Sequence, residues 1–123
     1  MFEWVLVPLM TQEEEKLINE IKDSGKIILL FVIDEKLKQE PASVVSEKIK
    51  QAENYLEKIK KEIEKIKPEA LVNDYLEWGR WDEKITSIAK IEAVKNILIK
   101  KNEQAELIIP KLKASGLEIT VIE

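Results

Sequence analysis

The sequence contains no cysteine and no histidine. Without cysteine the chain can form no disulfide, no zinc–thiolate cluster and no thiol nucleophile. Without histidine it lacks the commonest general base, the usual transition-metal ligand and every Ser-His or Cys-His pair. Any chemistry would have to use carboxylates, lysines, hydroxyls and backbone amides. These absences argue against an enzyme, and we predict no catalytic set, no metal site and no cofactor.

A basic stripe and a long apolar run are also missing. The formal charge is −4, with 20 basic and 24 acidic residues mixed along the chain, so nucleic acid is a poor partner. Residues 1–10 are apolar but too short to cross a bilayer, and no basic segment or cleavage site accompanies them. We therefore expect a buried strand there, no membrane insertion and a cytoplasmic location.

The residues that are present fit one domain. Apolar residues make up 45% of the 123, enough for a core, and no repeat or low-complexity segment divides residues 1–123. Charged residues reach 36%, mostly lysine and glutamate beside many isoleucines, a composition that leans toward a thermophilic source.

Two apolar runs near the start predict buried strands. Residues 2–9 form the first, which Pro8 closes, and residues 26–34 form the second. The apolar residues of the second run are consecutive and do not alternate with polar ones. This pattern is typical of a parallel strand that helices cover on both faces.

A helix is predicted between these two strands. Thr11 and Glu14 have the spacing of a capping box, so the helix should begin near Gln12. Gly25 follows it and is expected to adopt the left-handed conformation at its end. Its apolar face consists of Leu17, Ile18 and Ile21.

A long helix is predicted after the polar connection that contains Pro41, and Pro68 ends it. Ser43 or Ser46 could cap it. Its apolar residues recur in heptads, which fits either a coiled-coil seam or a helix that lies on a sheet. We favour the helix on a sheet, because stable coiled coils usually sustain more than three heptads. The heptad residues are Val45, Ile49, Ala52, Leu56, Ile59, Ile63 and Ile66.

Residues 70–78 predict a third strand, and Asp82 could cap the helix that follows it. If that helix ran on through Leu98, its apolar residues would swing to the opposite face. The chain must therefore change structure near Glu92, and residues 94–100 become the fourth strand.

The last part of the chain predicts one more helix and one more strand. Asn102 would cap the helix, Pro110 would kink it, and Gly116 would free the chain for a strand at residues 117–122. A strand at residues 106–109 is the alternative, but the residues after it are too few for a parallel crossover.

The alternation of strands and helices predicts an α/β fold. It should have three layers, with a five-stranded, mostly parallel sheet between helices on both faces. Ligands of such sheets bind beyond the carboxyl ends of the strands. Any site should therefore lie at that edge.

Short motifs along nearly the whole chain resemble the universal stress protein family. They are Val7-Pro8, Val32-Ile33-Asp34, and the series Gly79, Ile85, Ala89 and Ile97-Leu98-Ile99. The resemblance implies the adenine-nucleotide α-hydrolase-like strand order 3-2-1-4-5. It also implies a homodimer that pairs through the last strand, with Leu117, Ile119 and Val121 as candidates.

The chain departs from the family where ATP would bind. ATP-binding members carry an aspartate after the first strand, where this chain has Leu9 and Met10. They also carry a glycine-rich loop after the fourth strand, whose backbone amides close around phosphates. Here residues 100–105 contain no glycine. We therefore expect that the chain does not bind ATP in the usual way.

Weaker candidates for a site remain. Lys100 and Lys101 precede a predicted helix start and could hold an anion, or they could be ordinary solvated lysines. The loop around Arg80 could contact a partner, or its tryptophans could cover a core edge while Arg80 pairs with a carboxylate. Residues 13–15, three glutamates, are most simply a first helical turn and not a metal site. The weak crevice candidates are Met10, Val32, Lys100 and Lys101.

Two functions stay open on the sequence. The first is a homodimeric, stress-related or regulatory interaction protein with no usual ATP site and no identified protein partner. The second is a protein that binds a small molecule or anion, nucleotides included, in a crevice that needs no glycine.

Overall fold

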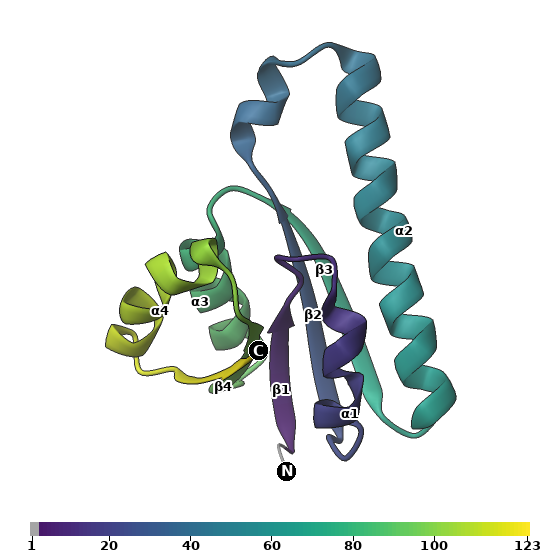
Figure 1. Cartoon of the computed structure of the whole chain (residues 1–123), viewed down its shortest axis with the longest axis vertical. Coiled ribbons are helices and arrows are strands. Elements are labelled where there is room, and N and C mark those ends of the chain that lie inside the picture. Colours follow the sequence, from purple (N-terminus) through teal and green to yellow (C-terminus); the bar gives the residue numbers. More distant parts are fainter. Residues whose placement is uncertain (1–2) are drawn as a thin grey trace.

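The computed structural model describes residues 3–123, and in it one five-stranded sheet lies between two layers of helices (Figure 1). Every neighbouring pair of strands is parallel, and the strand order is β3-β2-β1-β4-β5. The predicted fold class and strand order are confirmed, although Phe2 of the first predicted strand lies outside the described residues. The strands are β1 (Trp4–Pro8), β2 (Lys26–Ile33), β3 (Leu71–Trp78), β4 (Asn96–Lys100) and β5 (Glu118–Ile122).

The helices divide between the two faces of the sheet. One face carries α1 and α2, and the other carries α3 and α4 (Figure 1). This arrangement follows from right-handed crossovers that run in opposite directions from the central strand β1. The helical segments are η1 (Glu14–Leu17), α1 (Ile18–Ile21), η2 (Glu35–Gln39), α2 (Ala42–Ile66), α3 (Trp81–Ile91) and α4 (Glu103–Ala114).

Two apolar cores hold the layers together. Ile27 and Leu29 of β2 face α1 and α2, whereas Ile28 and Leu30 face α3 and α4. Each of these side chains is fully buried, and burial of one such side chain stabilises the fold by roughly 1.5–3 kcal/mol. The consecutive apolar residues of β2 thus reflect burial on both faces, as predicted.

The first helix begins later than predicted. Gln12 has a φ of 62°, and the helical segment starts at Glu14. Half of the predicted capping box forms, because the Glu14 carboxylate accepts the Thr11 N–H at 2.8 Å. The Glu14 N–H does not bond to Thr11 and instead donates to the Tyr55 hydroxyl at 2.9 Å. A long-range contact has replaced half of the local one.

Two expectations near α1 and α2 are wrong. Gly25 does not adopt a left-handed conformation; its N–H donates to the Glu3 carbonyl at 2.8 Å. Neither Ser43 nor Ser46 caps α2, which begins at Ala42 directly after Pro41. The Pro41 carbonyl accepts the first N–H bonds of the helix, and the fixed φ of proline suits this position.

From Ala52 onward, the heptad residues of α2 pack on the sheet. Ala52, Leu56, Ile59 and Ile63 are buried there, whereas Ile66 is 52% exposed. The interpretation of a helix on a sheet is therefore correct. The first turns of α2 and the whole of η2 project past the end of the sheet (Figure 1).

The second half of the chain agrees with most of the predictions. The helix α3 ends at Ile91 with Glu92 as its C-cap, and the Asn102 side chain caps α4 by accepting the Ala105 N–H at 2.6 Å. The helix α4 continues through Pro110, so the rejected strand does not form. Asp82 is not the cap of α3, because Arg80 occupies that position and Asp82 lies in the first turn.

The helices α3 and α4 end in the same hydrogen-bonded turn with different residues at its left-handed position. After α3 this residue is Ala93, with φ 56°, and after α4 it is Gly116, with φ 87°. In both turns the next residue donates back to the helix, Val94 to the Ala89 carbonyl and Leu117 to the Leu112 carbonyl. Only glycine adopts this conformation without a steric penalty.

Glycine at position 93 and alanine at position 116 should therefore change the stability of the fold in opposite directions. We expect Ala93→Gly to stabilise the fold by about 1 kcal/mol and Gly116→Ala to destabilise it by a similar amount. A side chain at Gly116 would meet no atom within 4 Å, so its effect is purely conformational. Urea denaturation measures both, and a destabilising Ala93→Gly would contradict this account.

Candidate functional site

Two hollows open at the carboxyl edge of the sheet, one on each side of η2. The α4 hollow measures about 680 Å³ and lies between the ends of β2 and β3, the start of α3, and α4. The α2 hollow measures about 510 Å³ and lies between β2, η2 and the first half of α2. Val32, Asp34 and Lys36 border both hollows. Both hollows thus lie at the carboxyl edge of the sheet, where the sequence predicts that any ligand site would be.

The α4 hollow contains a compact group of charges. The Arg80 guanidinium lies 2.9 Å from the Asp82 carboxylate, and the Lys111 ammonium lies 3.6 Å from it. Burial alone would raise the pKa of Asp82, but the charge and hydrogen bond of Arg80 and the charge of Lys111 outweigh it and hold the pKa below its ordinary value. Arg80 and Lys111 are thus already engaged by the protein, whereas Lys36, which also borders this hollow, has no carboxylate within 4 Å in residues 3–123.

The predicted crevice residues do not come together. Val32 is buried and borders both hollows, whereas Met10 is half-buried against the core under α3 and α4 and lines neither hollow. Leu9 precedes Met10 at the position where the resemblance leads one to expect an aspartate. Its side chain is buried in the core under α1 and α2. Leu9 and Met10 thus take part in apolar packing.

Lys100 and Lys101 both contact Glu123. Lys100 donates to the Glu123 main-chain oxygen at 2.7 Å, and Lys101 donates to its carboxylate at 3.0 Å. The hydrogen bond and the charge of Glu123 raise the pKa of Lys101, and those of Lys101 lower the pKa of Glu123. An anion at this loop would have to displace Glu123, so the predicted anion site stays a prediction.

The start of α4 is also occupied by the chain itself. The Asn102 side chain accepts the Ala105 N–H that a phosphate would otherwise accept. With no glycine in residues 100–105, the backbone has no residue that adopts left-handed angles freely. Residues 100–105 therefore contain no glycine-rich loop.

The two remaining candidates have structural explanations. Arg80 pairs with Asp82 and, at 3.5 Å, with Glu83, which is the local pairing that the sequence suggested. Of the three glutamates, only Glu14 is buried, at 2% exposure. Its carboxylate accepts hydrogen bonds from the Thr11 hydroxyl and from the Tyr55 hydroxyl at 2.6 and 2.8 Å. Burial and the bond to Glu14 raise the pKa of Tyr55.

No pattern in the sequence indicated a second polar cluster, here named the Glu92 network. Glu92 lies 2.9 Å from the Lys26 ammonium and accepts hydrogen bonds from Asn73 and Tyr75. The hydrogen bond to Tyr75, the bond to Lys26 and the bond to Asn73 hold the pKa of Glu92 below its ordinary value, although burial opposes them. The bond to Glu92 raises the pKa of Tyr75 to about 12.

The strand β5 forms one open edge of the sheet. Glu118 donates its N–H to Lys95 on the β4 side, and Ile122 accepts the Lys101 N–H there. Because alternate residues of a parallel strand direct their main-chain groups to opposite sides, Ile119 and Val121 direct theirs to solvent. The Val121 side chain is 40% exposed, whereas Leu117 and Ile119 pack against the core under α4.

The comparisons with known proteins rest on structure. No protein-family profile and no curated protein match the sequence. The solved hypothetical protein MJ0577 is 23% identical with a TM-score of 0.76, over 99% of this chain and 96% of that one.

No helix within residues 3–123 is both long and apolar enough to span a membrane.

Two further solved structures carry the family name. A protein of the universal stress protein family from Burkholderia pseudomallei is 13% identical, with a TM-score of 0.74 over 98% of this chain and 95% of that one. Universal stress protein UspA from Lactobacillus plantarum is 10% identical, with a TM-score of 0.71 over 100% and 99%. At these identities the likeness concerns the fold, and the chain has the fold of the universal stress proteins.

Proposed function

We propose that this chain is a universal stress protein-like interaction protein that acts as a homodimer and does not bind ATP in the usual way. The observation that carries the proposal is the open edge of β5. There the N–H and C=O groups of Ile119 and Val121 point away from the sheet beside an exposed Val121 side chain. Such an edge pairs readily with a second strand, and an isologous pairing closes a dimer.

The loop after β4 supports the ATP part of the proposal. Glu123 engages Lys100 and Lys101, and Asn102 caps α4. Leu9 and Met10 leave no carboxylate after β1. The groups that would meet a triphosphate are thus absent or occupied, and a stress-related or regulatory role through protein contacts remains.

Blocking the β5 edge tests the dimer. Proline at Val121 removes an N–H that faces solvent, so Val121→Pro should leave the sheet intact but prevent strand pairing. We expect sedimentation to show a concentration-dependent dimer for the wild type, and a dissociation constant at least about tenfold higher for Val121→Pro. A wild type that stays monomeric would sink the proposal.

The other edge of the sheet provides the matched control. Leu71 donates its N–H to Gly25, just before β2, and Gly79 donates to Ile33 of β2. The alternation therefore directs the Asp74 N–H to solvent on the β3 edge. Asp74→Pro should therefore leave the dimer unchanged. Thr120→Pro is unsuitable, because Thr120 faces β4 and proline there would break the sheet.

Nucleotide titration addresses ATP and the small-molecule alternative together. A ligand at 100 times its dissociation constant would stabilise the folded state by about 2.7 kcal/mol. We expect 1 mM ATP or AMP to leave the melting midpoint unchanged. The alternative would place a ligand in the α4 hollow, where it would have to compete with Asp82 for Arg80 and Lys111. A shift of the midpoint that Arg80→Met abolishes would establish binding there instead.

A further inference from the structure

We propose that the α2 hollow binds a small amphipathic carboxylate, a compound with one aromatic or branched apolar body and one carboxylate. The hollow lies on the α1 and α2 side of the sheet, and it shares Val32, Asp34 and Lys36 with the α4 hollow but not Arg80 or Lys111. Its volume of about 510 Å³ falls within the range of small-molecule sites, roughly 300–1,000 Å³. The proposal is independent of the dimer.

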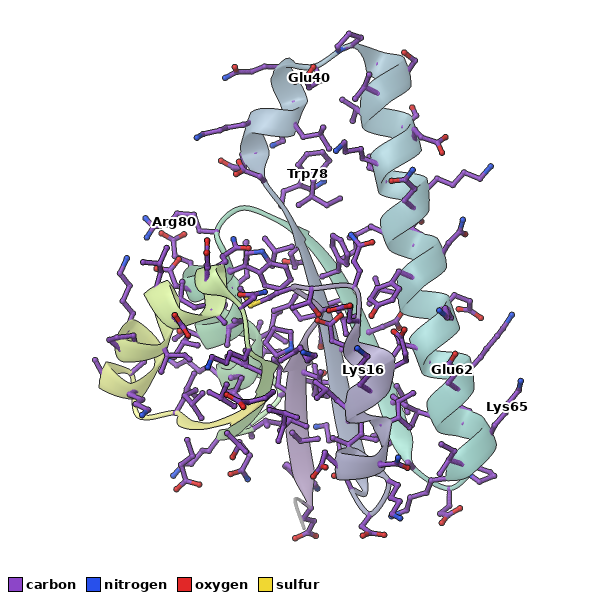
Figure 2. The ribbon with its side chains drawn as sticks, in the orientation of Figure 1. Lys16, Glu40, Glu62, Lys65, Trp78 and Arg80 are labelled. Carbon is purple, nitrogen blue, oxygen red and sulfur yellow. The ribbon has the colours of Figure 1, made fainter. Side chains whose placement is uncertain are left out.

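The walls of the hollow belong to different elements. Because η2 and the first turns of α2 both project past the sheet, the end of β2 forms a floor between them (Figure 1). Figure 2 shows Trp78 in the space between η2 and α2. The Lys38 ammonium lies 5.3 Å from the centre of its ring, which links η2 to the end of β3. The η2 wall is thus held in place without a ligand.

The floor and the inner walls are apolar. Phe31 and Ile33 come from β2, Leu37 from η2, and Val44 and Ala52 from α2. Phe31 and Leu37 are only half-buried, and Val44 is exposed. An apolar body placed over them would remove this surface from water, at roughly 25 cal/mol per Å².

Two lysines stand at the rim with free ammonium groups. Within residues 3–123, neither Lys36 nor Lys48 has a carboxylate within 4 Å, unlike Arg80 and Lys111 of the other hollow. The acidic residues of the rim are Asp34 and Glu40. The Asp34 carboxylate accepts the Lys36 N–H and so caps η2, which leaves Glu40 as the acidic side chain of the rim with no bond to residues 3–123.

Two amides complete the polar set. The Gln12 side chain has no hydrogen-bond partner within residues 3–123, and Gln51 makes one long contact, 3.5 Å to Glu47. Gln12 also has a left-handed backbone, a strained conformation for a residue with a side chain. Ammonium and amide donors above an apolar floor match a carboxylate on an apolar body, since charged hydrogen bonds are the strong ones.

Titration with 3-phenylpropionate tests the site. We expect amide chemical shifts to change most at Phe31, Leu37, Val44 and Gln51. Its neutral analogue, 3-phenylpropionamide, should bind about tenfold more weakly, because the amide loses the charge that Lys36 and Lys48 contact. Equal binding of acid and amide, or shifts confined to residues around Arg80 and Lys111, would overturn the proposal.

Two substitutions on α2 distinguish a direct contact of Lys48 with the ligand from the general effect of removing one positive charge. Lys48→Met keeps the length of the side chain and should weaken 3-phenylpropionate about tenfold. Lys65→Met, near the other end of the same helix, should leave binding unchanged (Figure 2). Val44→Trp should block the hollow without touching the core. If Lys65→Met weakens binding as much as Lys48→Met, the site is wrong.

Discussion

Replacing Glu92 with alanine should lower the free energy of unfolding by about 3 kcal/mol. Glu92 and Lys26 form an ion pair whose side chains are only 10% and 17% exposed. Without the carboxylate, the Lys26 ammonium and the donors of Asn73 and Tyr75 lose their shared acceptor. Removing one partner of such a pair costs more than the pair contributes, because the other charge stays desolvated.

The control for this substitution is an exposed glutamate of α3, the helix that ends just before Glu92. Within residues 3–123, the one ion pair of Glu83 is with Arg80, at 3.5 Å, and its side chain is 64% exposed. Glu83→Ala should change stability by about 0.5 kcal/mol or less. Urea denaturation of the two variants at pH 7 measures the difference, and similar losses in both would show that the Glu92 network contributes nothing special.

The pH dependence offers a second measurement of the same network. Folding lowers the pKa of Glu92, so its contribution is complete above the unfolded value of about 4.3 and is lost as pH falls through the folded value. The difference in stability between the wild type and Glu92→Gln should therefore be largest at pH 7 and smaller at pH 3. A difference that grows toward pH 3 would contradict the assigned direction.

Replacing Glu14 with alanine should lower the free energy of unfolding by roughly 2–3 kcal/mol. Its buried carboxylate accepts hydrogen bonds from the Thr11 N–H, the Thr11 hydroxyl and the Tyr55 hydroxyl. All three donors would lose their acceptor in a site that water reaches poorly. The loop after β1 would also lose its direct link to α2.

The neighbouring glutamates of the same short segment are the controls for this substitution. Glu13 and Glu15 are exposed, so their alanine variants should lose about 0.5 kcal/mol or less. A double-mutant cycle with Tyr55→Phe should give a coupling of about 1 kcal/mol between Glu14 and Tyr55. Equal losses at all three glutamates would refute the buried role of Glu14.

Local pattern was sufficient for the elements of the fold. The unbroken apolar run of β2 reflects its two covered faces, and the swing of apolar residues beyond Glu92 marks the end of α3. Asn102 was recognisable as a cap, since the residues it serves are its own neighbours. Each of these features depends on contacts close in sequence or on a simple periodicity.

The polar interactions of the site depend on distant residues, so no local pattern predicts them. Tyr55 is 41 residues from Glu14, and its hydroxyl replaces half of the capping box. Glu123 engages Lys100 and Lys101 from the far end of β5. The α2 hollow exists because η2 and α2 both extend past the sheet. The local sequence of either segment alone does not predict this arrangement.

The central position of β1 has a consequence for synthesis on the ribosome. One side of β1 pairs with β2 along five residues, whereas its other side meets β4 at the single pair Leu6 and Ile97. The first three strands and α2 can assemble once Trp78 has emerged, and the apolar β1 edge then waits for a strand that is not yet made. The nascent chain therefore passes through a stage in which the apolar edge of β1 is exposed and open to pairing with a strand of another chain.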